Sequence, residues 1–373
     1  MHGPRALPYD SARMSDATVE AAEVVLPCSD LSAALPFYME RLGFRLDSIS
    51  PADAPSAATL SGHGVRIRLE RGVDAGPGVL RLRCRDVQRF AGGAAWLTAP
   101  NGTRVELVDA DLKPVLPPLR PSLVIATMGG DSAWGQGRAG MKYRDLIPDR
   151  QGGRFIASHI QIPEAGPVPD YVHFHRVRFQ MIFVRKGWVR VVYEDQGPPF
   201  VLRTGDCVLQ PPQIRHRVLE SSEKLEVIEL SSPAQHETLA DHELELPTAT
   251  VRHDRLFGGQ RFVRHQAGAA QWQPWRTSGF EARDTGIGEA THGLAEAHVL
   301  RPRGPGQAQP TRHEGELSFA FVLDGAATLW CEGHDAATLV GGDSCVVPPG
   351  LLHAWSECST DFELLHVGFP GNT

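Results

Sequence analysis

The feature that most constrains this chain is a long internal repeat, in which the last two-thirds match themselves at an offset of about 138 residues. The segment that begins at Tyr143 aligns with the segment that begins at Ala282, and the copies end in LEVIELSSP and FELLHVGFP. Within the alignment, Gly187 lies opposite Gly325. A period this long indicates a duplicated domain rather than a solenoid of short repeats.

Each copy consists of short runs rich in β-branched and aromatic residues, such as FIASHIQI and MIFVRKGWVRVVYE. These runs lack helical periodicity, and turn sequences such as RTGD and VGGD separate them. Many short strands joined by tight turns are typical of a sandwich or barrel. We therefore predict a mainly β protein with two tandem domains, at residues 142–246 and 247–373.

Residues 17–111 have a different pattern, which predicts an α+β domain. AEVVLPC predicts a strand, and Ser29 or Asp30 can cap a helix over LSAALPFYMERLG. FRLDSIS, AATLSG and VRIRLER follow as strands and complete a βαβββ unit, and VLRLRC, AAWLTAP and TRVELVD predict a shortened second unit. Residues 112–141 are rich in Pro and Gly, so we expect them to be a linker.

The composition indicates where the protein is located and which classes of partner it lacks. The formal net charge of -7 provides no basic surface for nucleic acid, and no apolar run approaches the roughly 20 residues that span a membrane. Residues 1–16 lack the apolar segment of a secretory signal and are expected to be a disordered leader, with Met14 as a candidate true start. Six cysteines without a CxxC pair predict reduced thiols in a cytoplasmic protein, and the preference for Arg over Lys suggests a bacterial source.

Three histidines of the first copy carry the chemistry. His173 and His175 are two residues apart, so on a strand both imidazoles point to the same face. His216 follows about 40 residues later, directly after a Pro-containing turn. Three imidazoles that converge in a barrel suit Fe, Ni, Cu, Mn or Zn and leave open positions for a substrate.

These residues resemble the two motifs of the cupin superfamily, a His-x-His pair with a following Glu and Gly, and then Gly, Pro and a third His. The first motif appears here as His173, His175, Gln180 and Gly187, and the second as Gly205, Pro211 and His216. The resemblance covers about residues 142–373. It implies two cupin barrels, also called jelly rolls or double-stranded β-helices, with a metal ion on the three histidines of the first.

Gln180 stands where the family normally has a metal-binding Glu, so the site resembles the all-histidine cupin dioxygenases. Neutral ligands leave a divalent metal its full charge, which favours an anionic chelating substrate and argues against oxalate decarboxylase-like chemistry. Gln180 and Glu229 are candidates for further ligands or for hydrogen-bond partners of the ligands. The candidate pocket residues are Tyr171, Arg178, Trp188 and Tyr193.

The second copy keeps fewer of the motif residues. Thr311, His313 and Ser318 occupy the positions of the first two histidines and the Glu, and His353 occupies the third histidine position. His366 on the last strand is a candidate third ligand if its side chain points inward. We predict a degenerate site, in a barrel that is structural or binds a small molecule without metal.

The segments LPFYMERLGFRLDSI and APNGTRVELVD resemble the vicinal oxygen chelate family, which includes glyoxalase I and bleomycin-resistance proteins. The resemblance implies metal ligands at Glu23, Glu70, Val79 and Glu106. Val79 cannot bind metal, so only Glu23 and Glu106 are weak candidates. We expect a degenerate domain used for packing or dimerisation.

Together, these features predict an Fe(II)-dependent dioxygenase that acts on a small anionic organic substrate, with Ni, Mn, Zn or Cu as alternative metals. One alternative is a non-catalytic bicupin that binds or senses a small molecule, and a second is a metal-dependent isomerase or lyase. No nucleic acid or membrane partner is expected. A homodimer through strand edges is expected because both resembled folds expose such edges.

Overall fold

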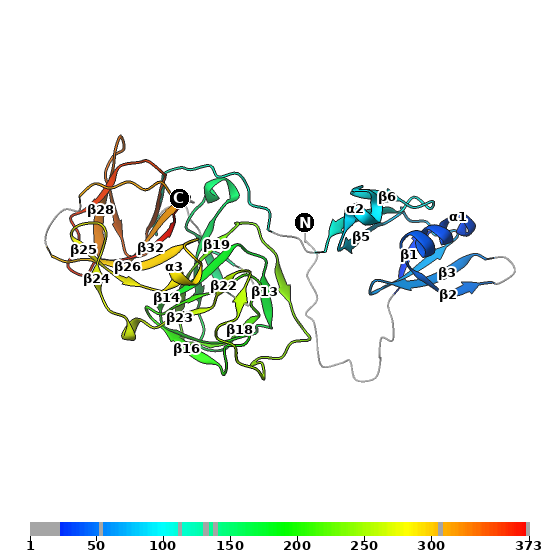
Figure 1. The fold of residues 1–373 in the computed structure, drawn as a ribbon, viewed down its shortest axis with the longest axis horizontal. Coiled ribbons are helices and arrows are strands. Elements are labelled where there is room, and N and C mark those ends of the chain that lie inside the picture. The colour runs from blue at the N-terminus through cyan, green and yellow to red at the C-terminus, as the bar shows by residue number, and fades with distance from the viewer. Residues whose placement is uncertain are drawn as a thin grey trace, which may run out of the picture. The chain divides into compact units, whose positions relative to one another are not determined.

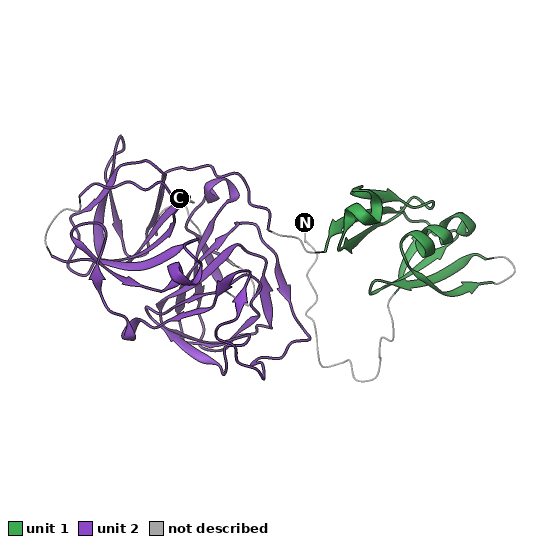
Figure 2. Ribbon diagram, viewed as in Figure 1, with its two compact units in different colours: residues 1–112 green, residues 113–373 purple. Residues whose placement is uncertain are grey.

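The computed structural model describes residues 23–51, 55–110, 114–129, 134–136, 141–304 and 309–370. It divides the chain into unit 1, residues 1–112, and unit 2, residues 113–373 (Figure 2). The expected leader and Met14 lie outside the described residues. Among the residues described, no helix has the length and apolar character needed to cross a bilayer.

Unit 1 contains a βαβββ segment followed by a shorter βαββ segment. The elements are β1 (Val24–Pro27), α1 (Leu31–Pro36), the π-helical turn η2 (Phe37–Arg41), β2 (Arg45–Ser50), β3 (Ala57–Gly62), β4 (Val65–Glu70), β5 (Val79–Cys84), α2 (Val87–Ala91), β6 (Trp96–Thr98) and β7 (Arg104–Asp109). Asp30 caps α1, because its carboxylate accepts hydrogen bonds from the main-chain N–H groups of Ser32 and Ala33. The sheets β1-β4-β3-β2 and β5-β7-β6 share one buried core, to which Tyr38 and Val105 contribute.

The first barrel of unit 2 is formed by two sheets, with strand orders β23-β17-β14-β19-β11-β10-β9 and β16-β15-β18-β13-β20 (Figure 1). Its elements are β9 (Gly135–Gln136), β10 (Lys142–Asp145), η4 (Arg150–Gly153), β11 (Ile156–Ile162), β12 (Gly166–Pro167), β13 (His173–His175), β14 (Phe179–Lys186), β15 (Trp188–Tyr193), β16 (Phe200–Arg203), β17 (Cys207–Leu209), β18 (His216–Ser221), β19 (Leu225–Ser232), β20 (Thr238–Ala240), β21 (Leu256–Phe257), β22 (Gln260–Arg261) and β23 (Val263–His265). Alternate residues point inward, so Val189, Val191 and Tyr193 of β15 fill the interior.

The second barrel repeats this plan with sheets of order β24-β25-β26-β32-β27-β30-β8 and β29-β28-β31. Its elements are β8 (Val124–Ala126), η5 (Ala267–Ala269), β24 (Gln273–Pro274), β25 (Phe280–Asp284), α3 (Ile287–Ala290), β26 (Glu296–Pro302), β27 (Leu317–Asp324), β28 (Ala326–Cys331), β29 (Ala337–Val340), β30 (Ser344–Val347), β31 (His353–Ser356) and β32 (Glu363–Phe369). Gly187 and Gly325 both adopt positive φ, 86° and 70°, between equivalent strand pairs. This backbone geometry explains why both copies have Gly at that turn.

The two barrels share strands across the order of the sequence. The span that we expected to be a linker, 112–141, supplies β9 to the first barrel and β8 to the second, where Val124 pairs with Val346. Conversely, β23 lies in the range expected for the second copy but pairs with β17 of the first barrel. The strands therefore tie the barrels together independently of the chain connection between them.

The outer faces of the two large sheets pack against each other in one hydrophobic core, which includes Phe179 and Met181 from the first barrel and Phe319 from the second. Charged side chains also cross this interface. Arg154 and Arg178 of the first barrel both donate to the carboxylate of Glu316 in the second, at 2.9 and 3.0 Å. The barrels thus form one continuous folded body, with the interior of each barrel facing away from this core.

Candidate metal centre

The structure brings His173, His175 and His216 together inside the first barrel. His173 on β13 pairs directly with His216 on β18, and the alternation of β13 places His175 on the same face. One possible ligand atom from each imidazole lies within 4.8 Å of those of the other two. His173 and His216 are buried, with 1% and 6% of their surfaces exposed. The motif spacing therefore corresponds to a real spatial cluster.

Each of the three imidazoles is oriented by an oxygen atom at its Nδ1 position. The contacts are His173 with the carbonyl of Tyr171 at 2.8 Å, His216 with the carbonyl of Ile214 at 3.0 Å, and His175 with the hydroxyl of Thr238 at 2.9 Å. An imidazole that donates Nδ1–H to an oxygen has its lone pair on Nε2, which is the ordinary arrangement of a metal-ligating histidine. The donor set therefore fits a divalent transition metal.

Two residues near the cluster were missed by the sequence analysis. The carboxylate of Asp170 is almost completely buried and lies 3.6 Å from Nδ1 of His173, while it accepts a hydrogen bond from the main-chain N–H of Val218. Its position three residues before His173 was an available signal. The ring of His236 lies 5.6 Å from that of His175, and its Nδ1 faces the carbonyl of Pro233 at 2.9 Å. No sequence motif marks His236, because only the return of the chain after β19 brings it there.

Tyr193 is the predicted pocket residue with the closest relation to the histidines. Its buried ring stacks on His216 with centroids 5.4 Å apart, and its hydroxyl accepts a hydrogen bond from Gln210 at 2.8 Å. Burial raises the pKa of Tyr193, and the nearby carboxylate of Glu229 adds to the shift. Tyr193 is therefore protonated at neutral pH and cannot serve as an anionic ligand.

Gln180, Glu229 and Tyr171 occupy different surroundings. Gln180 is 1% exposed, and its main-chain carbonyl accepts a hydrogen bond from the main-chain N–H of Gln210. Its side-chain Nε2 has no hydrogen-bond partner in the described part of the chain. Glu229 accepts from the hydroxyl of Ser231 at 3.4 Å. Tyr171 is 45% exposed and meets the ring of His173 edge-on, so it lies at the rim rather than inside.

Two predicted pocket residues lie elsewhere. Trp188 is five residues from Tyr193 on β15, roughly 16 Å away at strand spacing, and on the opposite face. Arg178 forms the ion pair with Glu316 that joins the barrels. Sequence proximity to the motif does not reveal strand direction or the position of the second barrel, which explains why these two residues lie away from the expected positions.

The motif positions of the second copy do not form a three-ligand cluster among the described residues. Thr311 pairs with His353 as His173 pairs with His216, but its hydroxyl replaces an imidazole. His353 is oriented like His216, with Nδ1 3.2 Å from the carbonyl of Leu351, whereas His313 directs Nε2 to the carbonyl of Val347 at 2.7 Å. Ser318 and His366 lie 3.3 Å apart, Oγ to Nε2.

A second cluster exists in this barrel, at positions that the sequence analysis missed. Possible ligand atoms of Glu296, His298 and His366 lie within 4.8 Å of one another. The side chain of His366 does point inward, but the two other possible ligands of its cluster are on β26 rather than at the motif positions. The signal that could have found the cluster is the pairing of β26 with β32, which places His298 opposite His366.

The two weak candidates in unit 1 are held in ion pairs. Glu23 lies 3.0 Å from Arg66, and Glu106 lies 2.6 Å from Arg81. Neither belongs to a group of three potential metal ligands within the described residues. The structure therefore gives these carboxylates a role in side-chain pairing and does not assemble the expected ligand set.

Comparison with known proteins identifies the class of the second barrel: residues 298–368 match the family described as the cupin domain. Among solved structures, oxalate decarboxylase from Bacillus subtilis aligns with a TM-score of 0.50 and 12% identity, over 70% of this chain and 79% of that chain. The formate complex of Lactobacillus farciminis oxalate decarboxylase aligns with the same score and identity, over 69% and 88%. Similarity at this level shows a shared fold alone. No curated protein sequence matches this chain.

Proposed function

We propose that this protein is a metal-dependent dioxygenase whose first barrel holds Fe(II) on His173, His175 and His216. The observation that carries the proposal is the cluster of three imidazoles, each with an oxygen atom at hydrogen-bond distance from its Nδ1. When bound, the ion would polarise and acidify a small anionic chelating substrate such as an enolate, phenolate or thiolate. A ligand set without a carboxylate favours an anionic substrate, because it leaves the positive charge of the ion uncompensated.

The chain contributes orientation and a dry environment. Asp170 and the carbonyl of Tyr171 fix the ring of His173, and the stacked ring of Tyr193 fixes that of His216. The amide of Gln180 is buried and offers N–H groups for hydrogen bonding to a bound oxygen-rich substrate. Substrate orientation then depends on uncharged donors rather than on a protein carboxylate.

A second candidate function is oxygen-independent lyase or isomerase chemistry on the same metal. The observation that favours it is His236, an imidazole 5.6 Å from the ring of His175 that is placed to move a proton to or from a bound substrate. The Bacillus subtilis oxalate decarboxylase of similar fold has Mn(II) centres, which supports a decarboxylase-like lyase as an alternative for this fold. A non-catalytic bicupin that binds a small molecule is the remaining alternative.

The test is elemental analysis of protein purified without added metal or a histidine tag, followed by oxygen uptake with a panel of enolates, phenolates and thiolates. We expect bound iron and oxygen uptake in the wild type, loss of both in His175→Gln, and retention in His253→Gln, an exposed histidine of the same barrel. Turnover without oxygen consumption would establish the lyase or isomerase reading. Absence of metal after reconstitution would leave a ligand-binding protein.

We also propose that unit 1 is a degenerate domain of the vicinal oxygen chelate type that contributes to a homodimer. Its βαβββ order and the absence of a ligand cluster among its described residues support this proposal. Sedimentation of the full chain and of residues 113–373 tests it. A shorter chain that remains dimeric would refute the role of unit 1.

A further inference from the structure

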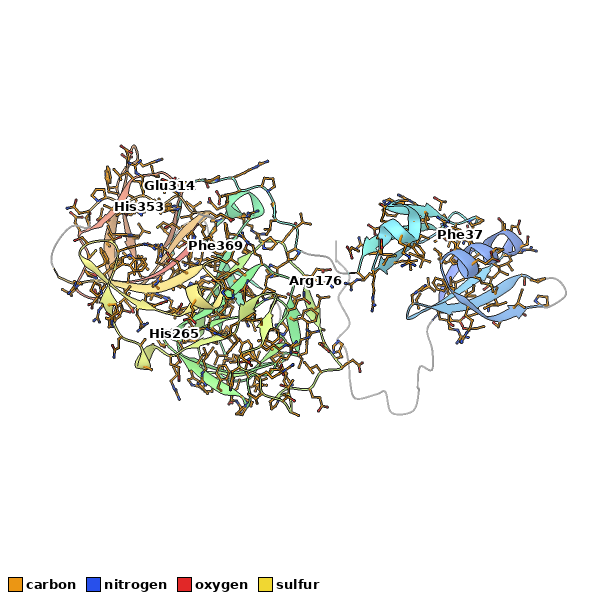
Figure 3. All side chains as sticks on the ribbon, viewed as in Figure 1. Phe37, Arg176, His265, Glu314, His353 and Phe369 are labelled. Carbon is orange, nitrogen blue, oxygen red and sulfur yellow. The ribbon has the colours of Figure 1, made fainter. Side chains whose placement is uncertain are left out.

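The second barrel contains a cavity of about 580 Å³, which is within the range of small-molecule sites. Strands β26, β27, β31 and β32 line it, together with Trp275 before β25 and the segment before β27. Figure 3 labels three of its lining residues, Glu314, His353 and Phe369. The cavity therefore includes His353, the residue that aligns with His216 of the first barrel.

Glu296 and His366 line this cavity, and a possible ligand atom of His298 lies within 4.8 Å of theirs. His298 and His366 are direct cross-strand partners, and Glu296 precedes His298 by two residues, so all three side chains share one face. That face points into the barrel, because the alternate residues Ala297 and Val367 belong to the core between the barrels. The register of two strands thus assembles two imidazoles and one carboxylate.

Two ring nitrogens in this cluster are buried without a partner. Nδ1 of His298 and Nδ1 of His366 have no hydrogen-bond partner among the described residues. A buried polar atom without a partner is costly, and a cation bound by the lone pair of a neutral imidazole removes that cost.

Gly368 leaves space beside the cluster because it has no side chain. A Cβ atom at Gly368 would lie 3.0 Å from Oε1 of Glu296 and 3.3 Å from Cε1 of His366, so any larger residue would crowd both. Strand pairing places Ile156, Ser158 and Glu229 of the first barrel at the positions of the three cluster residues. The cluster is therefore particular to the second barrel and is not inherited from the repeat.

We propose that the second barrel binds a first-row divalent metal ion through Glu296, His298 and His366, apart from the cupin motif positions. Two histidines and one carboxylate are the donor set of open zinc and non-haem iron sites, which keep positions for an exogenous ligand. The cavity provides room for a small anionic ligand of that ion.

Neighbouring groups hold the three side chains in place. The hydroxyl of Ser318 lies 3.3 Å from Nε2 of His366, and Asp284 lies 3.6 Å from Nε2 of His298. Arg276 donates to Oε1 of Glu296 at 2.5 Å, which leaves the second oxygen of this carboxylate for the cation. Such contacts from surrounding groups to ligating side chains are characteristic of metal sites.

The experiment is equilibrium dialysis of the untagged full chain against ZnCl₂, followed by elemental analysis. We expect about two bound ions in the wild type, about one in His298→Gln, about one in His216→Ala and none in the double variant. His334→Gln, an exposed histidine of the second barrel, is the matched control and should bind as the wild type does. Gly368→Val, which fills the space without removing a ligand, should weaken the second site by about tenfold or more.

The zinc retained by each single variant also shows that the variant is folded. Full wild-type binding by His298→Gln would overturn the proposal, as would the loss of all zinc in His216→Ala. Full binding by His216→Ala together with loss in His298→Gln would instead refute the first-barrel centre and leave the second site intact. The two proposals therefore fail separately.

Discussion

The two barrels share one strand plan but collect their histidines on different strands. In the first barrel, the cluster lies on β13 and β18, at the ends of two adjacent strands of the smaller sheet. In the second, Thr311 has replaced one of those imidazoles, and a new cluster lies on β26 and β32 of the larger sheet. The comparison teaches that a duplicated barrel can lose a ligand set at one place and gain another where strand register brings compatible side chains together.

The largest expected difference in metal affinity is between variants at two aligned positions, His216 in the first barrel and His353 in the second. His216→Ala should weaken metal binding at the first centre by at least about 100-fold, because it removes a ligand rather than a group that orients one. His353→Ala should leave that affinity unchanged, since His353 belongs to no three-ligand cluster among the residues described. Titration of the metal-free chain with Fe(II) under anaerobic conditions measures both. Equal losses in the two variants would contradict the assignment of the centre to the first barrel.

A second comparison concerns two carboxylates at matched positions, Glu226 and Glu363. His159 and Arg185 lower the pKa of Glu226 to about 2 from its ordinary 4.5, whereas burial raises the pKa of Glu363. A lowered carboxylate pKa stabilises the fold above about pH 4.5, and the contribution disappears as the pH falls towards 2. A raised pKa has the opposite sign, since the fold prefers the protonated form of Glu363.

Glu226→Gln should therefore lower the free energy of unfolding at pH 7, by on the order of 3 kcal/mol, and the difference from wild type should shrink in acid. Glu363→Gln should raise the free energy of unfolding at neutral pH, and this gain should also disappear once the carboxyl is protonated. Urea denaturation at several pH values between neutral and acid measures both. Changes in the free energy of unfolding that have the same sign in both variants would contradict the opposite pKa shifts of Glu226 and Glu363.

Removal of the shared carboxylate at the interface should have a smaller effect. Glu316→Ala leaves Arg154 and Arg178 unpaired, with side chains only 17% and 22% exposed. We expect a loss of about 2 kcal/mol in the free energy of unfolding. Arg190→Ala breaks an exposed pair with Glu220 and should cost less than about 1 kcal/mol. Denaturation curves that shift equally for both variants would show that the inter-barrel ion pairs stabilise the fold no more than an exposed pair does.

The smallest expected effect tests the group that orients one histidine. Thr238→Val removes the hydroxyl that contacts Nδ1 of His175, and should weaken metal binding by about tenfold while the fold is retained. Thr338→Val, on an exposed part of β29, is the control in the other barrel. Metal affinity by competition with a chelator is the measurement. An unchanged affinity in Thr238→Val would show that the hydroxyl does not position the ligand.

The first-barrel cluster was predictable because its histidines belong to a local pattern with a fixed spacing. The second cluster was not, because the repeat alignment places His298 opposite His159, whereas strand pairing places it opposite Ser158. A shift of one residue on a strand reverses the face to which a side chain points. His159 accordingly faces outward, where its ring contacts Phe321 of the other barrel, and His298 lies on the face of β26 that carries Leu300 into the interior.

The same limit explains the misplaced pocket residues. Trp188 and Arg178 lie near the motif in sequence, but pocket position depends on which end of a strand and which face of a sheet a residue occupies. The partner of Arg178 is Glu316 of the second barrel, which is far away in the sequence and could not be inferred from the motif. Local chemistry was therefore predictable, and long-range pairing was not.

The exchange of strands between the barrels has a consequence for biosynthesis. A ribosome releases β8 before any part of the first barrel, yet the partner of β8 is β30, which follows all strands of the first barrel in the chain. During translation this early segment must wait, with an exposed hydrogen-bonding edge, until the carboxyl-terminal part of the chain emerges. The edge of β8 therefore needs protection from mispairing until β30 has been made.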